Sequence, residues 1–123
     1  MNKSNFVIGK TSDFDASRGY FIGQFMAKYG RQDLVTDLID IGWKKLTPDF
    51  KETPHYHKIG IDINIIVSGH VTVIIDGQSW DLYPKDFLVV YPPTILEDYI
   101  VHEETELVVI KTPSVAGDKY TIE

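Results

Sequence analysis

Cysteine is absent from the 123-residue sequence. Disulfide bonds, thiolate nucleophiles and zinc sites built on cysteine are therefore excluded, although this absence leaves the redox compartment open. Long hydrophobic runs are also missing, and the chain does not open with a basic segment followed by an apolar one. We therefore expect neither a membrane span nor a signal peptide, and we predict a cytoplasmic protein.

Clusters of positive charge are equally scarce. Only Lys44 and Lys45 are adjacent basic residues, and the formal net charge is −6. Nucleic acids and anionic membranes attract proteins that carry a basic surface, so both are excluded as expected partners. A small-molecule ligand is the partner class that this composition leaves open.

The chain does contain enough apolar material for one folded domain. Hydrophobic residues make up 43% of it, including seven Tyr, six Phe and two Trp. A chain of this length forms one core rather than two. We divide it into an N-terminal segment, residues 1–33, and a body, residues 34–123. The aromatic cluster at Tyr20, Phe21 and Phe25 indicates that the N-terminal segment packs on the body.

The body has the pattern of short β-strands separated by turns. Asp76-Gly77 predicts a two-residue hairpin, because that tight turn needs positive φ at both central positions. Pro92-Pro93 stops the strand before it, since proline cannot donate to a sheet. The predicted strands are 34–46, 55–57, 61–67, 71–75, 78–82, 87–91 and 106–111. So many short strands in a small chain predict an all-β sandwich or barrel.

The segment around His55 and His57 carries the clearest chemical signal. Residues two apart in a strand point to the same face, so the two imidazoles project together. Asp62 begins the next apolar strand, and the intervening hairpin returns its carboxylate towards the histidines. Two histidines and a carboxylate suit iron, manganese or zinc with open coordination positions. An exposed histidine pair, with Asp62 as a turn residue, is the alternative.

The segment from His55 to Gly69 resembles the first motif of the cupin superfamily. In that motif His-x-His is followed by a Glu and later by a Gly, and here His55, His57 and Gly69 stand at the same spacing, with Asp62 in place of the Glu. The resemblance implies an antiparallel barrel of the double-stranded β-helix kind, also called a jelly roll. It also implies a divalent metal ion, manganese, iron or zinc, bound by these side chains.

The second cupin motif is less complete. Lys85-Asp86 stands at its Gly-Asp, residues 87–91 form its strand, and Pro92-Pro93-Thr94 matches its Pro-x-Gly without the glycine. The metal-ligand position of this motif, usually His, falls at Glu97. We therefore include Glu97 in the predicted metal set, with an acidic residue of a solvated loop as the alternative.

Three further residues are predicted to line the pocket. Asn64 and Ile66 lie on the same side of their strand as Asp62. Asn64 is the stronger polar candidate, because a polar side chain in a buried strand needs a hydrogen-bond partner. Tyr91 is predicted to form part of the pocket wall.

Two functions follow from the resemblance. The first is a metal-dependent enzyme, an oxygenase, isomerase, epimerase or lyase, acting on a small acid or sugar. The second is a non-catalytic module that binds a small molecule without metal. Barrels of this kind commonly pair, and the N-terminal segment has the aromatic residues to cover or extend a partner's sheet, so we predict a homodimer.

Overall fold

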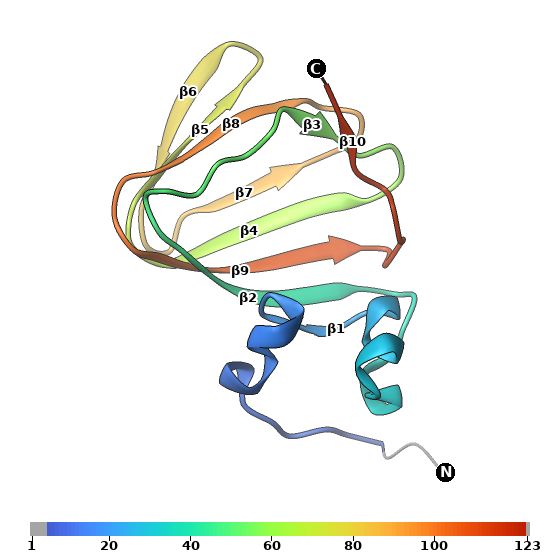
Figure 1. Cartoon of the computed structure of the whole chain (residues 1–123). Helices are drawn as coiled ribbons and strands as arrows, with labels where there is room; N and C mark the ends of the chain where they lie inside the picture. The colour runs from blue at the N-terminus through green and yellow to red at the C-terminus, as the bar shows by residue number, and fades with distance from the viewer. Residues whose placement is uncertain (1–4, 123) are drawn as a thin grey trace.

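The computed structural model describes residues 5–122 and contains ten strands and three short 3-10 helices within that range (Figure 1). The helices are η1 (Thr11–Ser17), η2 (Gln24–Tyr29) and η3 (Gln32–Leu34). The strands are β1 (Tyr20–Ile22), β2 (Asp40–Leu46), β3 (His55–Tyr56), β4 (Ile61–Ser68), β5 (Val71–Ile75), β6 (Gln78–Leu82), β7 (Phe87–Val90), β8 (Leu96–Val101), β9 (Thr105–Thr112) and β10 (Tyr120–Thr121). The predicted all-β class is confirmed. Within residues 5–122, the helices are too short to cross a membrane.

The strands form two five-stranded sheets. The first sheet has the order β1-β2-β9-β4-β7 and the second has the order β10-β3-β8-β5-β6. Neighbouring strands are antiparallel throughout. Consecutive strands often belong to different sheets, so the chain crosses repeatedly between the two layers, as the colour gradient of Figure 1 shows.

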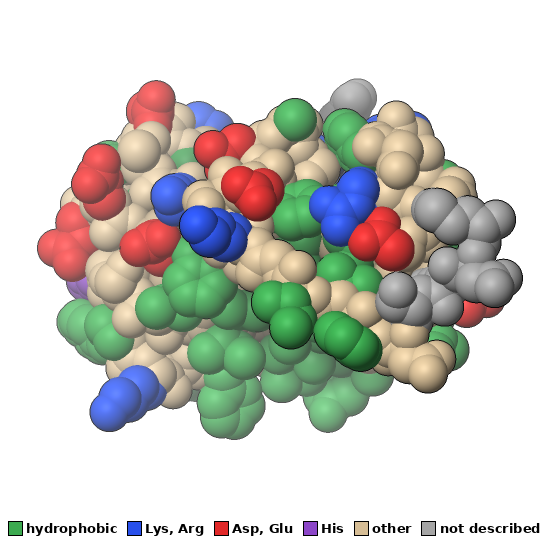
Figure 2. All heavy atoms as spheres, turned by 90° about the horizontal axis from the view of Figure 1, so that it is seen from below, with side chains coloured by type: hydrophobic (Ala, Val, Ile, Leu, Met, Phe, Trp, Pro, Cys, Tyr) green, Lys and Arg blue, Asp and Glu red, His purple; other side chains and the backbone are tan. Residues whose placement is uncertain are grey.

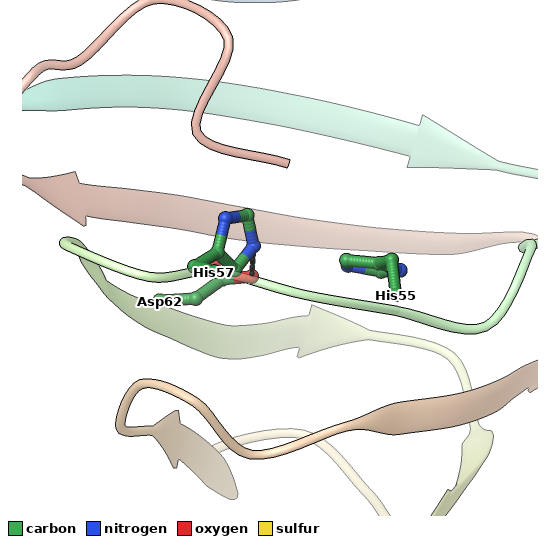
Figure 3. A group of neighbouring side chains, drawn as sticks. All are labelled: His55, His57 and Asp62. Atoms are coloured by element: carbon green, nitrogen blue, oxygen red, sulfur yellow. Dashed lines mark ion pairs between the residues drawn. The ribbon is translucent and has the colours of Figure 1, made fainter. Parts of the chain in front are cut away.

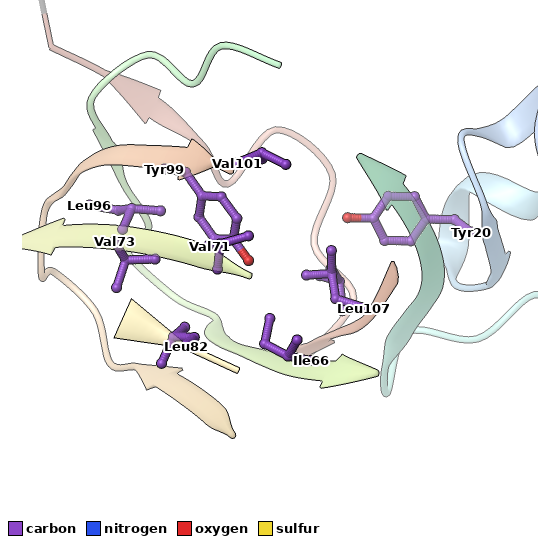
Figure 4. Packing of buried hydrophobic residues seen from close by; sticks show 10 residues of the cluster. Tyr20, Ile66, Val71, Val73, Leu82, Leu96, Tyr99, Val101 and Leu107 are labelled. Atoms are coloured by element: carbon purple, nitrogen blue, oxygen red, sulfur yellow. The ribbon is translucent and has the colours of Figure 1, made fainter. Parts of the chain in front are cut away.

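The hydrophobic core fills the space between the two sheets (Figure 4). Inward and outward residues alternate along each strand, which places every second side chain in this layer. The cluster is Tyr20, Ile66, Val71, Val73, Leu82, Leu96, Tyr99, Val101, Leu107 and Val109. Burial of this apolar area supplies the main driving force for folding.

The N-terminal segment contributes an edge strand to the body. β1 pairs with β2, with Tyr20 opposite Gly42. A Cβ atom at Gly42 would lie 2.8 Å from the Tyr20 ring, so glycine makes room for this aromatic side chain. Lys44 then lies over the ring, 4.3 Å from its centroid. The segment thus brings an aromatic wall to one end of the core.

The turns and strand boundaries follow the sequence signals closely in places. Asp76 and Gly77 have φ values of 53° and 73°, as the predicted hairpin requires. The strand predicted at 34–46 is shorter than expected and begins at Asp40, because residues 32–34 form η3 and residues 36–39 lead into the strand. The strand β8 was not predicted, although it pairs with both β3 and β5.

Candidate metal and ligand site

The histidines are brought together with Asp62 by β3 and the start of β4 (Figure 3). One atom from each of His55, His57 and Asp62 lies within 4.8 Å of the others, and we call this group the inner cluster. Both histidines are buried, at 4% and 7% exposure, and Asp62 is half-buried. The structure therefore places the three residues of the first motif in one buried site.

Backbone carbonyl groups fix the orientation of both imidazoles. Nδ1 of His55 lies 2.9 Å from the carbonyl oxygen of Thr53, and Nδ1 of His57 is hydrogen bonded to the carbonyl oxygen of Asp118. A carbonyl oxygen only accepts, so Nδ1 carries the proton in each ring. Nε2 of each ring, when neutral, then keeps its lone pair. Metal-binding histidines commonly show this arrangement, with the other ring nitrogen bonded to a backbone carbonyl.

The free nitrogen of His57 points towards Asp62. Nε2 lies 3.6 Å from Oδ2 of Asp62, beyond hydrogen-bond distance, and finds no hydrogen-bond partner within the described residues. A buried polar atom without a partner is costly and rare. The residues therefore fit a divalent cation, which would satisfy this nitrogen and the carboxylate together.

The pKa values of the two histidines are shifted in opposite directions. Burial lowers the pKa of His55, while the hydrogen bond to Thr53 and the charge of Glu52 oppose that shift. The Asp62 carboxylate raises the pKa of His57, against burial and with help from the carbonyl of Asp118. Burial therefore favours the neutral form of His55, whereas the Asp62 carboxylate favours the protonated form of His57. A cation bound at Nε2 of His57 would compete with that proton.

Two cavities adjoin the inner cluster. One of about 200 Å³ is lined by His57, Asp62 and Lys111 among others, and the other, of about 120 Å³, is lined by Asp62, Asn64 and Lys111. Asp62 and Lys111 line both, so the two spaces share a wall. The basic residues around them are Arg18, Lys44, Lys111 and Lys119.

A row of alternating charge crosses the floor of these cavities. Lys111 on β9 lies opposite Asp40 on β2 and opposite Asp62 on β4. Burial raises the pKa of Asp40, against the hydrogen bond from Ser114 and the charge of Lys111. Burial opposes the charge of Lys111, but nearby Tyr20 and Asp62 outweigh it and raise the pKa of this lysine. A fixed cation therefore lies beside the inner cluster.

Comparison with known proteins shows which solved structures share the fold of this chain. No family model matches the chain, and neither does any curated protein. A conserved protein with a double-stranded β-helix domain from Klebsiella pneumoniae matches with a TM-score of 0.63 and 20% identity, over 72% of this chain and 73% of that one. KdgF from a Halomonas species matches with a TM-score of 0.60 and 21% identity, over 66% and 74%. A cupin protein from Bacteroides fragilis matches with a TM-score of 0.57 and 20% identity, over 70% and 75%.

The chain has a cupin fold. The predicted double-stranded β-helix is therefore confirmed. Identities near 20% establish the architecture but leave the chemistry to the residues of this chain.

Glu97 does not join the inner cluster of this cupin fold, so its prediction as a metal ligand is corrected. Its carboxylate accepts a hydrogen bond from the backbone N–H of Gly77, 2.9 Å away at the β5–β6 turn. The reason is a register shift in β8: Ile74 faces Asp98 whereas Ile75 faces Leu96, so Glu97 is left over. Such a bulge redirects the extra side chain.

The predicted pocket residues fall in three different places. Asn64 is buried and lines the smaller cavity, where its amide donates to Asp62 and its carbonyl accepts from the Tyr99 hydroxyl, each at 3.2 Å. Ile66 belongs to the hydrophobic core. Tyr91 is 63% exposed, so its assignment to the pocket wall is wrong; it follows β7 at the point where the chain turns outward.

Sequence reasoning missed the residues that complete this site from the end of the chain. The Asp118 carboxylate accepts hydrogen bonds from the backbone N–H groups of Lys58, Ile59 and Gly60, and its own carbonyl holds His57. Burial opposes its ionisation, yet these N–H groups lower the pKa of Asp118. An isolated acid in a polar tail carries no sequence signal for such a role. Lys111 is the last residue of a predicted strand, and only the alternation of side chains along that strand indicates that it points inward.

Proposed function

We propose that this cupin-fold protein binds a divalent metal ion through His55, His57 and Asp62 and acts on a small acid or sugar acid beside it. The observation that carries the proposal is the buried Nε2 of His57, which lacks a hydrogen-bond partner within residues 5–122 and faces a carboxylate. With Glu97 bonded elsewhere, two histidines and one carboxylate remain. That set leaves open coordination positions, which suits iron(II), manganese or zinc.

The cations around the cavities support an anionic substrate class. Lys111 and Lys44 reach the smaller cavity from the inner faces of β9 and β2. A carboxylate of the ligand would be oriented by these ammonium groups, while Asn64 offers an amide to a neighbouring hydroxyl. A bound ion would supply Lewis acidity to a ligand oxygen. The protein side chains then position the ligand against the site.

The proposal is tested by elemental analysis of the untagged protein after incubation with manganese, iron(II) and zinc. We expect the wild type to hold one equivalent of metal ion more than His57→Ala, because only the inner cluster is disabled in this variant. Glu97→Gln is the matched control, because its side chain lies at the β5–β6 turn, and we expect it to keep the metal. Metal retained in His57→Ala at the wild-type level would contradict the assignment.

A metal-free binding module is the second candidate function. The outward position of Glu97 favours it, because the fourth ligand of the usual cupin set is missing. In that case no metal binds to the wild type at the inner cluster, and small acids still bind to the cavity. Calorimetric titration of a dicarboxylic acid into chelator-treated protein separates the two functions, because only the module binds it without metal.

We also propose that the protein is a homodimer paired through the outer face of the first sheet. Two apolar rows cross that face on β2, β9, β4 and β7. One row is Trp43, Val108, Ile65 and Phe87, and the other is Ile41, Ile110, Ile63 and Val89. Phe87 is 67% exposed. Seen from below, hydrophobic side chains gather along one side of the molecule, the lower edge of Figure 2.

A second copy is the occupant that best fits such a face. The rows hold no charge, so two copies related by a two-fold axis would meet without burying an unpaired ion. Sedimentation analysis tests the pairing with Ile65→Glu, for which we expect a monomer. Ile100→Glu is the matched control, since Ile100 is 38% exposed on the other sheet and Ile65 is 37% exposed. A monomeric wild type would contradict the proposal.

A further inference from the structure

A second group of metal-binding side chains lies on the outside of the second sheet. His70 lies in the β4–β5 turn, Asp81 is on β6, and His102 follows β8. One atom from each lies within 4.8 Å of the others, and we call this group the outer cluster. Val71 and Val73 on β5 are buried, so the Thr72 side chain between them points to the outer face of the sheet. The outer cluster therefore has no part in the cavities described above.

The backbone holds the two histidines side by side. The N–H of His102 donates to the carbonyl of His70 at 3.0 Å, which extends the β5–β8 ladder by one step. Gly69 has a φ of 95°, and a Cβ there would lie 2.2 Å from Oγ1 of Thr105, so only glycine turns the chain into this position. The N–H of His70 is bound to the same Thr105 hydroxyl. The two histidines are thus held directly next to the paired strands β5 and β8, and Asp81 lies on β6.

The side chains are already arranged around one point. Nε2 of His70 lies 3.0 Å from Oδ1 of Asp81, and Nε2 of His102 lies 2.6 Å from the Thr72 hydroxyl. That hydroxyl donates to the same Asp81 oxygen at 2.6 Å. The ring of His70 is stacked between those of Tyr83 and His102, with centroids 4.4 and 4.3 Å away. Stacking on both sides restricts rotation of this imidazole.

The separation between His70 and Asp81 is close to that expected around a tetrahedral ion, and the His102 ligand atom lies within 4.8 Å of both. Two ligand atoms, each about 2.0–2.1 Å from zinc, lie about 3.3 Å apart. The separation between His70 and Asp81 is close to that value, and Asp81 and His102 are exposed, so a hydrated ion can reach them. Two imidazoles and a carboxylate are the donors that zinc and copper prefer over magnesium or calcium.

We propose that His70, Asp81 and His102 form a surface site for a zinc-type transition-metal ion, independent of the inner cluster. On binding, the ion would take the place of the proton on Nε2 of each neutral imidazole, that proton would move through solvent to Nδ1, and the hydrogen bonds from His70 to Asp81 and from His102 to Thr72 would break. It ties the β4–β5 turn, β6 and the β8–β9 loop together. Water fills the fourth position. The site therefore acts as a metal clip on the outer sheet, and does not depend on the function proposed for the cavity.

The test uses the full-length, untagged His57→Ala protein, in which the inner cluster is disabled. We expect calorimetric titration with zinc to show one site and thermal unfolding to shift upward with zinc, because an ion that binds only the folded state stabilises it. Adding His102→Ala should weaken zinc binding at least tenfold and remove the thermal shift. Adding Asp81→Asn to His57→Ala should also weaken zinc binding. Because asparagine has nearly the same shape as aspartate, this variant shows that the loss does not come from misfolding.

Glu103→Gln is the matched control, since Glu103 is an exposed acid next to His102 outside the outer cluster. We expect it to leave zinc affinity unchanged. Cobalt substitution gives a second readout, as a tetrahedral site with histidine ligands should show visible d–d absorption that the His102→Ala variant lacks. Absence of zinc binding to His57→Ala at concentrations on the order of 1 mM would overturn the proposal. So would binding of equal affinity in His57→Ala/His102→Ala.

Discussion

The inner and outer clusters contain the same side chains, two histidines and one aspartate, in opposite surroundings. The inner histidines are buried and their Nδ1 atoms are bound to backbone carbonyls, so Nε2 is left for a ligand. In the outer cluster the Nε2 atoms already contact side chains, and the group is open to water. The same donor set therefore occurs beside a cavity in one place and on an open sheet surface in the other, where we propose a ligand-binding site and a stabilising clip respectively. Residue type alone does not distinguish these roles.

The strongest test of this difference replaces the aspartate of each cluster, one at a time, by alanine. Asp62→Ala removes the only carboxylate of the inner cluster, so we expect metal affinity there to fall at least 100-fold, because a ligand is lost rather than reoriented. Asp81→Ala should leave the inner metal in place. Competition with a chelator measures both. Equal loss of inner metal in the two variants would show that the clusters are coupled.

The dependence of the inner cluster on distant chain segments is tested by Asp118→Ala. Three backbone N–H groups lose a charged acceptor, so we expect the free energy of unfolding to fall by about 2–4 kcal/mol. Urea denaturation measures this change. Glu103→Ala, an exposed acid with no such role for its side chain, should change stability by less than about 0.5 kcal/mol. Equal stability of the two variants would contradict the stabilising role of the Asp118 carboxylate.

A smaller effect is expected from Lys44, which lines the cavity proposed to bind anions. Burial and the nearby charges of Arg18, Lys111 and Lys119 lower the pKa of Lys44 to about 8. This lysine is therefore charged below that pH and loses its charge above it. We expect the affinity for a small carboxylate to drop about fivefold as the pH rises through that value, corresponding to about 1 kcal/mol. Calorimetry at several pH values measures it.

Lys44→Gln provides the control for this titration. The variant should bind the carboxylate about as weakly as the wild type at high pH, and its affinity should change little over the same range. A wild type whose affinity is flat across that range would remove Lys44 from the binding site.

The smallest effect concerns Tyr99, which donates a hydrogen bond to Asn64 next to the inner cluster. Tyr99→Phe keeps the ring in the core and loses one buried bond, so we expect a cost of about 1 kcal/mol in stability. Metal content should stay at the wild-type level. Thermal unfolding and elemental analysis check the two parts separately, and loss of metal would mean that Asn64 orients Asp62 more strongly than its distance indicates.

Local signals predicted much of the fold. The Asp76-Gly77 turn fixed the β5–β6 hairpin to the residue, because its backbone preference does not depend on the rest of the chain. The segment from Leu96 to Val101 gave no such signal. A bulge at Glu97 interrupts its alternation, so apolar and polar residues no longer follow a period of two.

The candidate site was predictable only where its residues are close in sequence. His55, His57 and Asp62 are close in sequence, and the short connection from β3 to β4 brings them together. The hairpin expected there is wrong, because β3 and β4 belong to different sheets. Lys111 and Asp118 reach the same place through sheet pairing and a long return of the chain. Contacts of that kind depend on the completed topology. They leave no periodic trace in the sequence.

The hydrogen bond between His57 and the Asp118 carbonyl also sets an order of events during protein synthesis. The two residues are 61 positions apart, and the same tail residue orders the loop at residues 58–60. While the ribosome is still adding the segment between them, His57 has neither its carbonyl partner nor its fixed tautomer. The nascent chain therefore contains the histidine pair well before the orientation of His57 is fixed, which requires residue 118 to have emerged and docked.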